Sequence, residues 1–414
     1  MITLQLLFWF GLALIVFTYL GYGLLVWLMV KIKGARNIPA DERTDDELPA
    51  VTLLIAAYNE AAILPQKLAN CRALDYPKDK LEILFVTDGS SDESPSILAG
   101  ASDVRLLHRP ERRGKIAAVE RAMATVNSPI TVLTDANTFL STNTIRRMVA
   151  DFQDPTVGAV AGEKRVISQG DASSGGEGLY WRYESFLKRK DSQWYSVVGA
   201  AGELYAVRTK LFHKVPGDTI LDDFMHTLLI ARDGYRVTYA PEAIAEEYAS
   251  ASVREELKRK VRICAGGWQS MSRLLPLLNP FRYGTLSVQY IGHRVLRWSL
   301  APLFLPIVFL ANLLLVLFGA HWFYTLAFSG QVLFYLAVWA GYLLRARQIG
   351  IPGFFAPYYF FIMNYSVYLG FWRFFRGRQS AVWEKAKRVD TPTVPSPKPS
   401  TKVGPSSSTM SAGL

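Results

Sequence analysis

Cysteine is scarce in this chain of 414 residues, which contains only Cys71 and Cys264. Two cysteines so far apart form no disulfide framework and lack the close spacing of a zinc site. The five histidines are scattered, and no basic stretch is interleaved with aromatic residues as in proteins that bind single-stranded nucleic acid. We therefore expect no nucleic-acid partner, and the low cysteine content is typical of a reducing compartment.

Charge is also sparse near both ends of the chain, where apolar residues gather. Apolar residues make up 50% of the sequence, and the mean hydropathy is +0.14. The apolar runs, each long enough to cross a bilayer, cover residues 4–30, 299–319, 322–344 and 353–375. The pattern predicts one N-terminal transmembrane helix (1–31) and about three C-terminal transmembrane helices (299–376).

Basic residues indicate the orientation of these helices. Lysine and arginine number 46 against 35 acidic residues, a net charge of +11. Lys31, Lys33 and Arg36 directly follow the first apolar run, which by the positive-inside rule places the next domain in the cytoplasm. One crossing before the domain and three after it would put the C-terminus outside, whereas the basic residues from Arg373 onward favour the cytoplasm. The side of the tail therefore stays open.

Composition divides the rest of the chain into four parts. Residues 32–50 are a charged linker with proline, and residues 51–250 have the pattern of a folded domain. Residues 251–298 combine basic and apolar stretches, as helices lying on a membrane surface do. Residues 377–414 are first basic and then rich in Pro, Ser, Thr and Lys, which predicts a disordered tail.

From residue 51 onward, strand patterns alternate with helical patterns. Strands are expected at residues 51–57, 81–86, 104–107 and 130–134. This alternation predicts an α/β fold whose parallel sheet is covered on both faces. Such sheets bind ligands beyond the carboxyl ends of their strands.

Polar side chains follow three of these strands where they end. Tyr58 and Glu60 come after the first strand, Asp88 after the second, and Asp135 and Asn137 after the fourth, in TVLTDANTFL. Two oxygen-bearing side chains two positions apart can bind one hard divalent cation. They can equally close the strand in an Asx turn, and Asp88 can cap the following helix.

A nucleoside diphosphate fits this set of residues. Lys115 can face a phosphate, and a metal ion on Asp135 and Asn137 can neutralise a departing diphosphate. Asp223, at the start of a predicted helix, can take a proton from an acceptor hydroxyl as a general base. The alternatives are that Lys115 is a solvated residue at a helix start and that Asp222 is an N-cap.

The segments AYNE, TDGSSD, RGK and TDAN occur in an order and spacing that resemble the membrane-embedded family 2 glycosyltransferases. That group includes cellulose, hyaluronan, chitin and poly-N-acetylglucosamine synthases, and the resemblance covers about residues 51–278 by motif. It implies a GT-A domain (a Rossmann-like nucleotide-diphospho-sugar transferase fold) inserted between transmembrane α-helices. It also implies that Tyr58, Glu60, Asp88 and Asp135 hold the nucleotide of a UDP-sugar and that Asp223, in ILDDF, is the base.

The sequence departs from the family pattern in two places. The second ligand of the DxD motif is Asn137, a neutral amide that adds no charge to a Mg²⁺ or Mn²⁺ site. The QxxRW motif of processive synthases has its best match in RKVRI, where Arg262 can face the diphosphate, and Trp268 with Gln269 follows later. The candidates for the acceptor side are Gly202, Glu203, Asp222, Trp268 and Gln269.

We expect an inverting, metal-dependent transfer of a sugar from a UDP-sugar to a hydroxyl of a glycan or lipid acceptor at the cytoplasmic face of the membrane. Inversion follows from a single base without a nucleophile opposite it. Several C-terminal spans favour a polysaccharide synthase. The alternatives are a single-transfer enzyme acting on a lipid and a non-catalytic membrane scaffold with a nucleotide-binding fold. A chain without long insertions fits the bacterial inner membrane.

Overall fold

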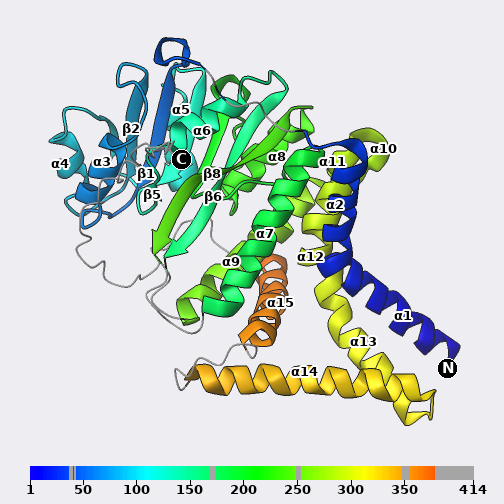
Figure 1. The fold of residues 1–414 in the computed structure, drawn as a ribbon. Helices are drawn as coiled ribbons and strands as arrows, with labels where there is room; N and C mark the ends of the chain where they lie inside the picture. Colours follow the sequence, from blue (N-terminus) through cyan, green and yellow to red (C-terminus); the bar gives the residue numbers. More distant parts are fainter. Residues whose placement is uncertain (37–40, 42, 168–173, 249–252, 347–354, 378–414) are drawn as a thin grey trace, which may run out of the picture.

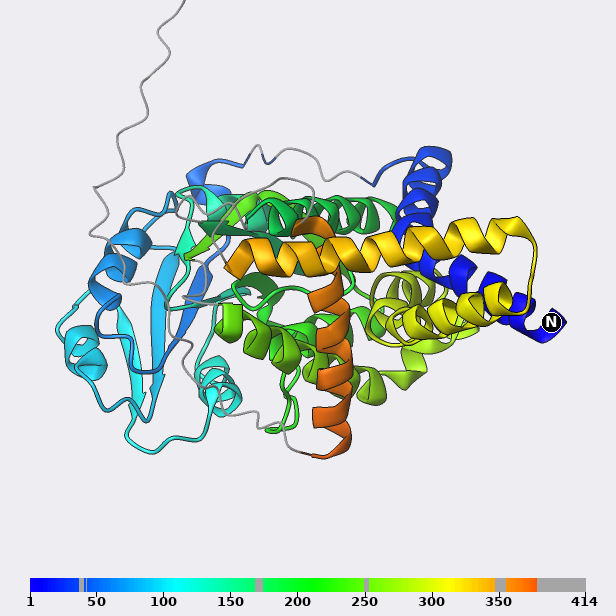
Figure 2. The same cartoon turned by 90° about the horizontal axis from the view of Figure 1, so that it is seen from below.

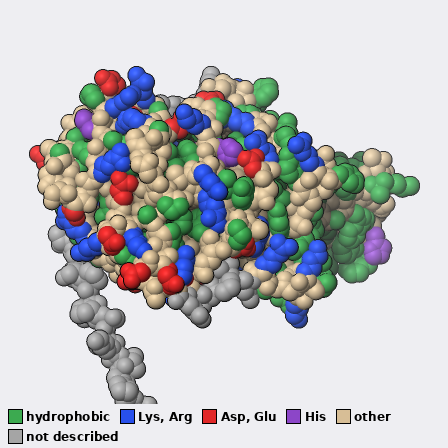
Figure 3. Space-filling view, turned by 90° about the horizontal axis from the view of Figure 1, so that it is seen from above, with side chains coloured by type: hydrophobic (Ala, Val, Ile, Leu, Met, Phe, Trp, Pro, Cys, Tyr) green, Lys and Arg blue, Asp and Glu red, His purple; other side chains and the backbone are tan. Residues whose placement is uncertain are grey.

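The computed structural model of the chain describes residues 1–36, 41, 43–167, 174–248, 253–346 and 355–377. One domain is built on a mixed sheet of eight strands, and helices from both ends of the chain gather at one side of it (Figure 1). Charged side chains are spread over the surface of this domain, whereas the projecting helical part is mainly hydrophobic (Figure 3). The predicted α/β class is confirmed.

The first half of the sheet is parallel, as expected. Its strands are β1 (Val51–Ala57), β2 (Leu81–Asp88), β3 (Arg105–Arg109) and β4 (Ile130–Asp135). β1 lies between β2 and β4 and is buried along its whole length. Such continuous burial explains why its seven residues are all apolar or β-branched, without alternation. The carboxyl ends of β1, β2 and β4 therefore meet at one edge.

The second half of the sheet is mixed rather than parallel. Its strands are β5 (Phe139–Leu140), β6 (Val157–Ile167), β7 (Leu204–Arg208) and β8 (Arg236–Tyr248). The order across the whole sheet is β3-β2-β1-β4-β7-β6-β8-β5. β7 runs antiparallel to β4, with Thr134 opposite Leu204. The reversal places Gly202 and Glu203, just before β7, at the carboxyl end of β4.

Helices cover both faces of the sheet and enclose two apolar cores. They are α3 (Leu64–Arg72), α4 (Ser94–Ala99), α5 (Lys115–Met123), α6 (Thr144–Asp151), α7 (Ser174–Trp194) and α8 (Asp222–Arg232). α3 begins at Leu64, four residues after Glu60. A proline is tolerated in the first turn of a helix, and Pro65 occupies that position in α3.

The helices outside the domain are α1 (Ile2–Val16), α2 (Tyr22–Lys33), α9 (Val253–Arg273), α10 (Pro280–Tyr283), α11 (Thr285–Tyr290), α12 (Leu296–Trp298), α13 (Leu300–Leu317), α14 (Trp322–Ala346) and α15 (Phe355–Phe375). Short π-helical segments join α1 to α2 (Phe17–Gly21) and α11 to α12 (Ile291–Val295).

Within the described residues, three helices are long and apolar enough to cross a membrane: Ile2–Lys33, Leu300–Leu317 and Trp322–Leu344. The third predicted C-terminal span corresponds to α15, which does not reach that threshold because tyrosine and other polar residues interrupt its apolar sequence. α15 crosses α14 (Figures 1 and 2) and packs along α9 instead. The predicted disordered tail lies outside the described residues from position 378 onward.

Candidate active site

A cavity of about 820 Å³ lies beside the ends of β4 and β7 and under α9 and α15. It brings together side chains that are far apart in the sequence. The predicted site residues that line it are Lys115, Asp135, Gly202, Glu203, Asp222, Asp223 and Arg262. The strand ends, the start of α8 and the basic turn of α9 thus face one space.

Lys115 lies at the centre of the acidic groups in this cavity. It is the first residue of α5, and its Nζ lies 2.7 Å from Asp135 Oδ1. A Cβ on Gly202 would lie 3.7 Å from Lys115 Nζ and 3.2 Å from Asp223 Oδ2, so the ammonium and that carboxylate border the same point. Burial opposes the charge on Lys115, but the Asp135 and Asp222 carboxylates outweigh it and raise the pKa of the ammonium.

The pKa values of Asp222 and Asp223 are shifted in opposite directions, although the two residues are neighbours in the sequence. Leu221 is the N-cap of α8, so Asp222 is the first helical residue rather than the cap. Burial opposes ionisation of Asp222, but Lys115 outweighs it and lowers the pKa of this carboxyl. Burial and the Asp222 carboxylate raise the pKa of Asp223 to about 7. A carboxyl with a pKa near neutrality suits a general base.

A second, small pocket of about 30 Å³ adjoins the cavity and is lined by Tyr58, Asp88, Arg112 and Gly114, among others. Asp88 Oδ2 accepts the backbone N–H groups of Arg113 (2.7 Å) and Gly114 (2.6 Å). Its other oxygen, Oδ1, is buried and has no hydrogen-bond partner among the described residues. Asp88 therefore does not cap α4, and it keeps one acceptor for a ligand donor.

Two predicted nucleotide and metal residues do not line either space. Glu60 is buried beside Ser94, whose Oγ accepts the Glu60 backbone N–H at 2.9 Å. Asn137 is buried behind the end of β4, next to Thr138. Neither side chain is among those that line the two spaces. Their functional assignments stay predictions.

The predicted acceptor residues of α9 also lie away from the cavity. The ring of Trp268 packs against Phe371, with the ring centroids 4.8 Å apart. Gln269 accepts the backbone N–H of Ile220 and donates to the carbonyl of Asp218, both at 2.9 Å. Gln269 therefore holds the loop that leads into α8. Neither residue is among those that line the cavity.

The far wall of the cavity contains residues to which the sequence analysis gave no role. They are aromatic or basic and come from α7, α12 and α15, from the turn after α15 and from the π-helical segment before α12. They include Tyr180, Trp181, Lys188, Arg294, Trp298, Trp372, Arg373 and Arg376. A sequence signal exists, because aromatic residues alternate with charged ones in α7 and arginines end the last apolar run. This sequence pattern alone does not show whether such residues line a cavity, pack in a core or lie at a membrane interface.

The residues at the end of β4 suit a divalent cation that arrives with a diphosphate. Within the described part of the chain, no three His, Cys, Asp or Glu side chains form a metal-binding group. Asp135 nevertheless faces the cavity, and Mg²⁺ is commonly held by one or two carboxylates together with substrate phosphates. The donor set therefore fits a shared ion rather than a site made of protein ligands alone.

The fold and the cavity at the strand ends define a GT-A protein. A solved mannosyltransferase, PcManGT from Pyrobaculum calidifontis in complex with GDP-Man and Mn²⁺, has the same fold with a TM-score of 0.67. The similarity covers 90% of this chain and 99% of that one, at 23% sequence identity.

The sequence match identifies one domain of the chain. Residues 52–215 match the model of glycosyl transferase family 2, so the chain carries a glycosyltransferase domain of that family. A probable glycosyltransferase of Bacillus subtilis, YdaM, is 27% identical over 56% of this chain and 58% of its own length. A poly-beta-1,6-N-acetyl-D-glucosamine synthase of Staphylococcus aureus is 29% identical over 55% of this chain and 57% of its own length. The chain thus matches little more than half of these relatives, and Asp222, Asp223 and Arg262 lie beyond the family match.

Proposed function

We propose that the chain transfers a sugar from a UDP-sugar to an acceptor hydroxyl, with inversion at the anomeric carbon. The observation that carries this proposal is the convergence of Lys115, Asp135 and Asp223 on one cavity beside a small pocket that ends at Asp88. The small pocket borders the nucleotide part of the site, and the cavity accepts the diphosphate, the sugar and the acceptor. The family match supports this activity.

The reaction is a single displacement. The acceptor oxygen attacks the anomeric carbon while the bond from that carbon to the diphosphate breaks, and UDP leaves with the bonding electrons. Asp223 takes the proton of the acceptor hydroxyl. Lys115 and Arg262 face the phosphate oxygens, where positive charge stabilises the departing diphosphate. Asp222 keeps Lys115 in place and maintains the high pKa of Asp223.

Asp135, which lines the cavity, would hold a Mg²⁺ or Mn²⁺ ion, whereas Asn137 would have to turn out of its buried position to join it. Such an ion supplies Lewis-acid neutralisation of the diphosphate. Lys115, which contacts Asp135 in this structure, is a flexible side chain and can turn toward the phosphates when the donor binds.

We propose a polysaccharide synthase in the bacterial inner membrane, with the domain in the cytoplasm. The staphylococcal relative, which is a poly-beta-1,6-N-acetyl-D-glucosamine synthase, and the apolar helices on both sides of the domain support this assignment. One observation favours a single transfer to a lipid instead. Met363 and Trp372 of α15 line the cavity, so an acceptor with an apolar tail could reach Asp223 along that helix.

Incubation of the full chain in nanodiscs with radiolabelled UDP-sugars tests the proposal. The panel consists of UDP-glucose, UDP-N-acetylglucosamine, UDP-galactose and UDP-glucuronate, each with Mn²⁺ or Mg²⁺. A ladder of products supports polymerisation, whereas one lipid-extractable product supports the single transfer. If Asp223→Asn releases UDP as fast as the wild type, the chain is not an enzyme of this kind and the scaffold alternative gains.

A further inference from the structure

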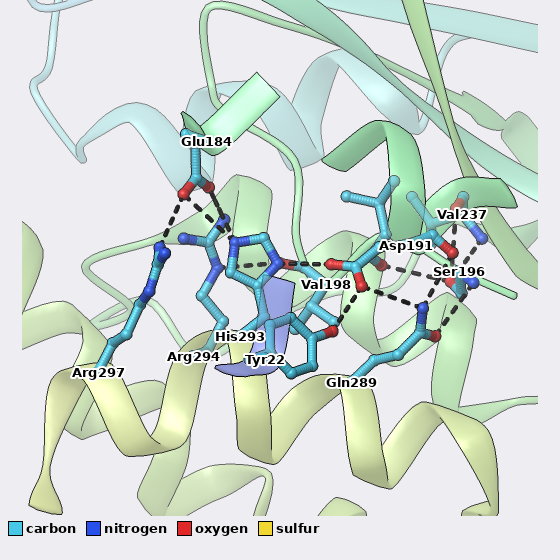
Figure 4. A network of polar contacts seen from close by, with 11 residues as sticks. Tyr22, Glu184, Asp191, Ser196, Val198, Val237, Gln289, His293, Arg294 and Arg297 are labelled. Atoms are coloured by element: carbon cyan, nitrogen blue, oxygen red, sulfur yellow. Dashed lines mark hydrogen bonds and ion pairs between the residues drawn. The ribbon is translucent and has the colours of Figure 1, made fainter. Parts of the chain in front are cut away.

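A buried polar network connects the N-terminal helix to the wall of the cavity (Figure 4). The Tyr22 hydroxyl, on α2, donates to Asp191 Oδ1 of α7 at 2.5 Å. His293 lies between two carboxylates, with Nδ1 2.5 Å from Asp191 Oδ2 and Nε2 3.3 Å from Glu184. Arg294 then contacts Glu184 at 2.8 Å. Each of these contacts joins segments that lie more than 100 residues apart in the sequence.

Asp191 needs the hydroxyl of Tyr22. The Asp191 side chain is fully buried, and a buried carboxylate is costly unless donors surround it. Its donors are Tyr22, His293 and the side-chain amide of Gln289, at 3.2 Å. Tyr22 is itself fully buried, and a Cβ on Gly292 would lie 2.2 Å from its ring. The N-terminal helix and the segment carrying His293 are therefore in direct contact.

The other end of the network forms part of the cavity wall. Glu184 and Arg294 both line the cavity. Burial opposes the charge on Glu184, but Arg294 and His293 outweigh it and hold the pKa of this carboxyl well below its usual range. Arg294 also donates from Nε to the carbonyl of Val198 at 3.1 Å, and its guanidinium lies 5.6 Å from the ring of Trp298. Arg294 is thus oriented by three groups, and Glu184 is the charged one.

Trp298 contacts both Arg294 in this wall and the residue next to Asp223, the proposed base. Its ring lies 5.3 Å from that of Phe224, the residue that follows Asp223. The side chains proposed to hold the nucleotide, such as Tyr58 and Asp88, come from the opposite end of the site, at the ends of β1 and β2. The network therefore bears on the acceptor half of the site rather than on the nucleotide half.

We propose that Tyr22 is a positioning residue for acceptor binding, acting through Asp191, His293 and Glu184 on Arg294. The N-terminal helix is then a working part of the glycosyltransferase site as well as a membrane segment. This inference rests on the proposed function, because the acceptor half of the cavity has meaning only for a transfer reaction.

The test uses Tyr22→Phe in the full chain in nanodiscs, which removes one hydroxyl and keeps the ring. The matched control is Tyr19→Phe, one turn earlier on the same apolar segment, where the hydroxyl donates to Asn364 of α15. The probes are UDP-N-acetylglucosamine as donor and N-acetylglucosamine oligomers as acceptor, because the staphylococcal relative is a poly-beta-1,6-N-acetyl-D-glucosamine synthase. We expect at least a fivefold rise in the acceptor KM for Tyr22→Phe. The donor KM and the affinity for UDP should stay within twofold, and Tyr19→Phe should leave all three within twofold.

Two further measurements separate a positioning role from general loosening. Tyr22→Phe combined with Glu184→Gln should raise the acceptor KM no more than Glu184→Gln alone, because both act on Arg294. Hydrogen exchange of residues 285–298 should speed up in Tyr22→Phe and not in Tyr19→Phe, a readout that needs no turnover. Unchanged exchange, an additive double variant, or an equal effect of Tyr19→Phe overturns the inference. A wild type that neither binds UDP nor releases it refutes the proposed function instead, and the exchange result still decides the coupling.

Discussion

The pairing of Asp222 with Asp223 makes a prediction about pH. The pKa of Asp223 is raised to about 7 by burial and by the Asp222 carboxylate. A base with that pKa is about one-tenth deprotonated at pH 6, so kcat/KM should fall about tenfold between pH 8 and pH 6. Asp222→Asn removes the neighbouring negative charge, and a like charge so close is worth roughly one to two pKa units. The acidic limb of the profile should therefore move to lower pH by about that amount.

The assay is UDP release from the UDP-sugar between pH 5.5 and 9, with the acceptor below its KM. The matched control is Asp218→Asn, the same chemical change in the preceding loop, where Asp218 binds Arg273 instead of facing the cavity. This control should leave the midpoint of the acidic limb unchanged. A midpoint that stays fixed in Asp222→Asn, or that moves to higher pH, would refute the assignment of Asp223 as the base.

Three further predictions concern single groups. Lys115→Met should weaken UDP binding at least tenfold, as measured by calorimetry, because a charge-assisted hydrogen bond to a phosphate is worth about 1.5–3 kcal/mol. An unchanged affinity for UDP would show that Lys115 does not bind the diphosphate. Chelation with EDTA should stop UDP release, and added Mn²⁺ should restore it. The Asp135→Asn variant should need a higher Mn²⁺ concentration for the same rate. Full activity in EDTA would exclude a metal requirement. Asp151 is buried outside the cavity, and burial raises its pKa from 3.8 to about 7, so the fold should lose stability as the pH rises from about 4 to 7 and lose no more above that. Asp151→Asn should remove that loss, which amounts to up to about 4 kcal/mol, and raise the Tm at pH 8 without changing the rate profile; a Tm with the same pH dependence as the wild type would contradict it.

Strand patterns predicted the sheet well where burial is continuous and less well where a proline intervenes. Residues 51–57 were expected as a strand and form β1 with the same bounds. β8 runs from Arg236 through Pro241 to Tyr248 without ending at the proline. The pairing with β6 jumps from Gly162–Ala240 to Glu163–Ile244, so Pro241 lies in a bulge that leaves the ladder intact on either side. The position of Pro241 can be read from the sequence, but the β-bulge in which it lies cannot.

The near side of the cavity could be predicted because parallel strands deliver their carboxyl ends to one edge. This reasoning brings Asp88 and Asp135 together without any knowledge of the packing. The far side depends on where α7, α12 and α15 lie after the chain has folded, and no local pattern encodes that arrangement. Trp268 illustrates the difficulty, since a helical tryptophan near a basic turn has the same sequence pattern whether it faces a ligand or Phe371.

The packing also indicates why the domain and the apolar helices occur in one chain. Asp223 and Lys115 come from the domain, but Arg262, Trp298 and Trp372, which close the same cavity, come from α9, α12 and α15. Without these helices the acidic pair of α8 would lose the wall that faces it across the cavity. The helices therefore complete the cavity that the domain begins.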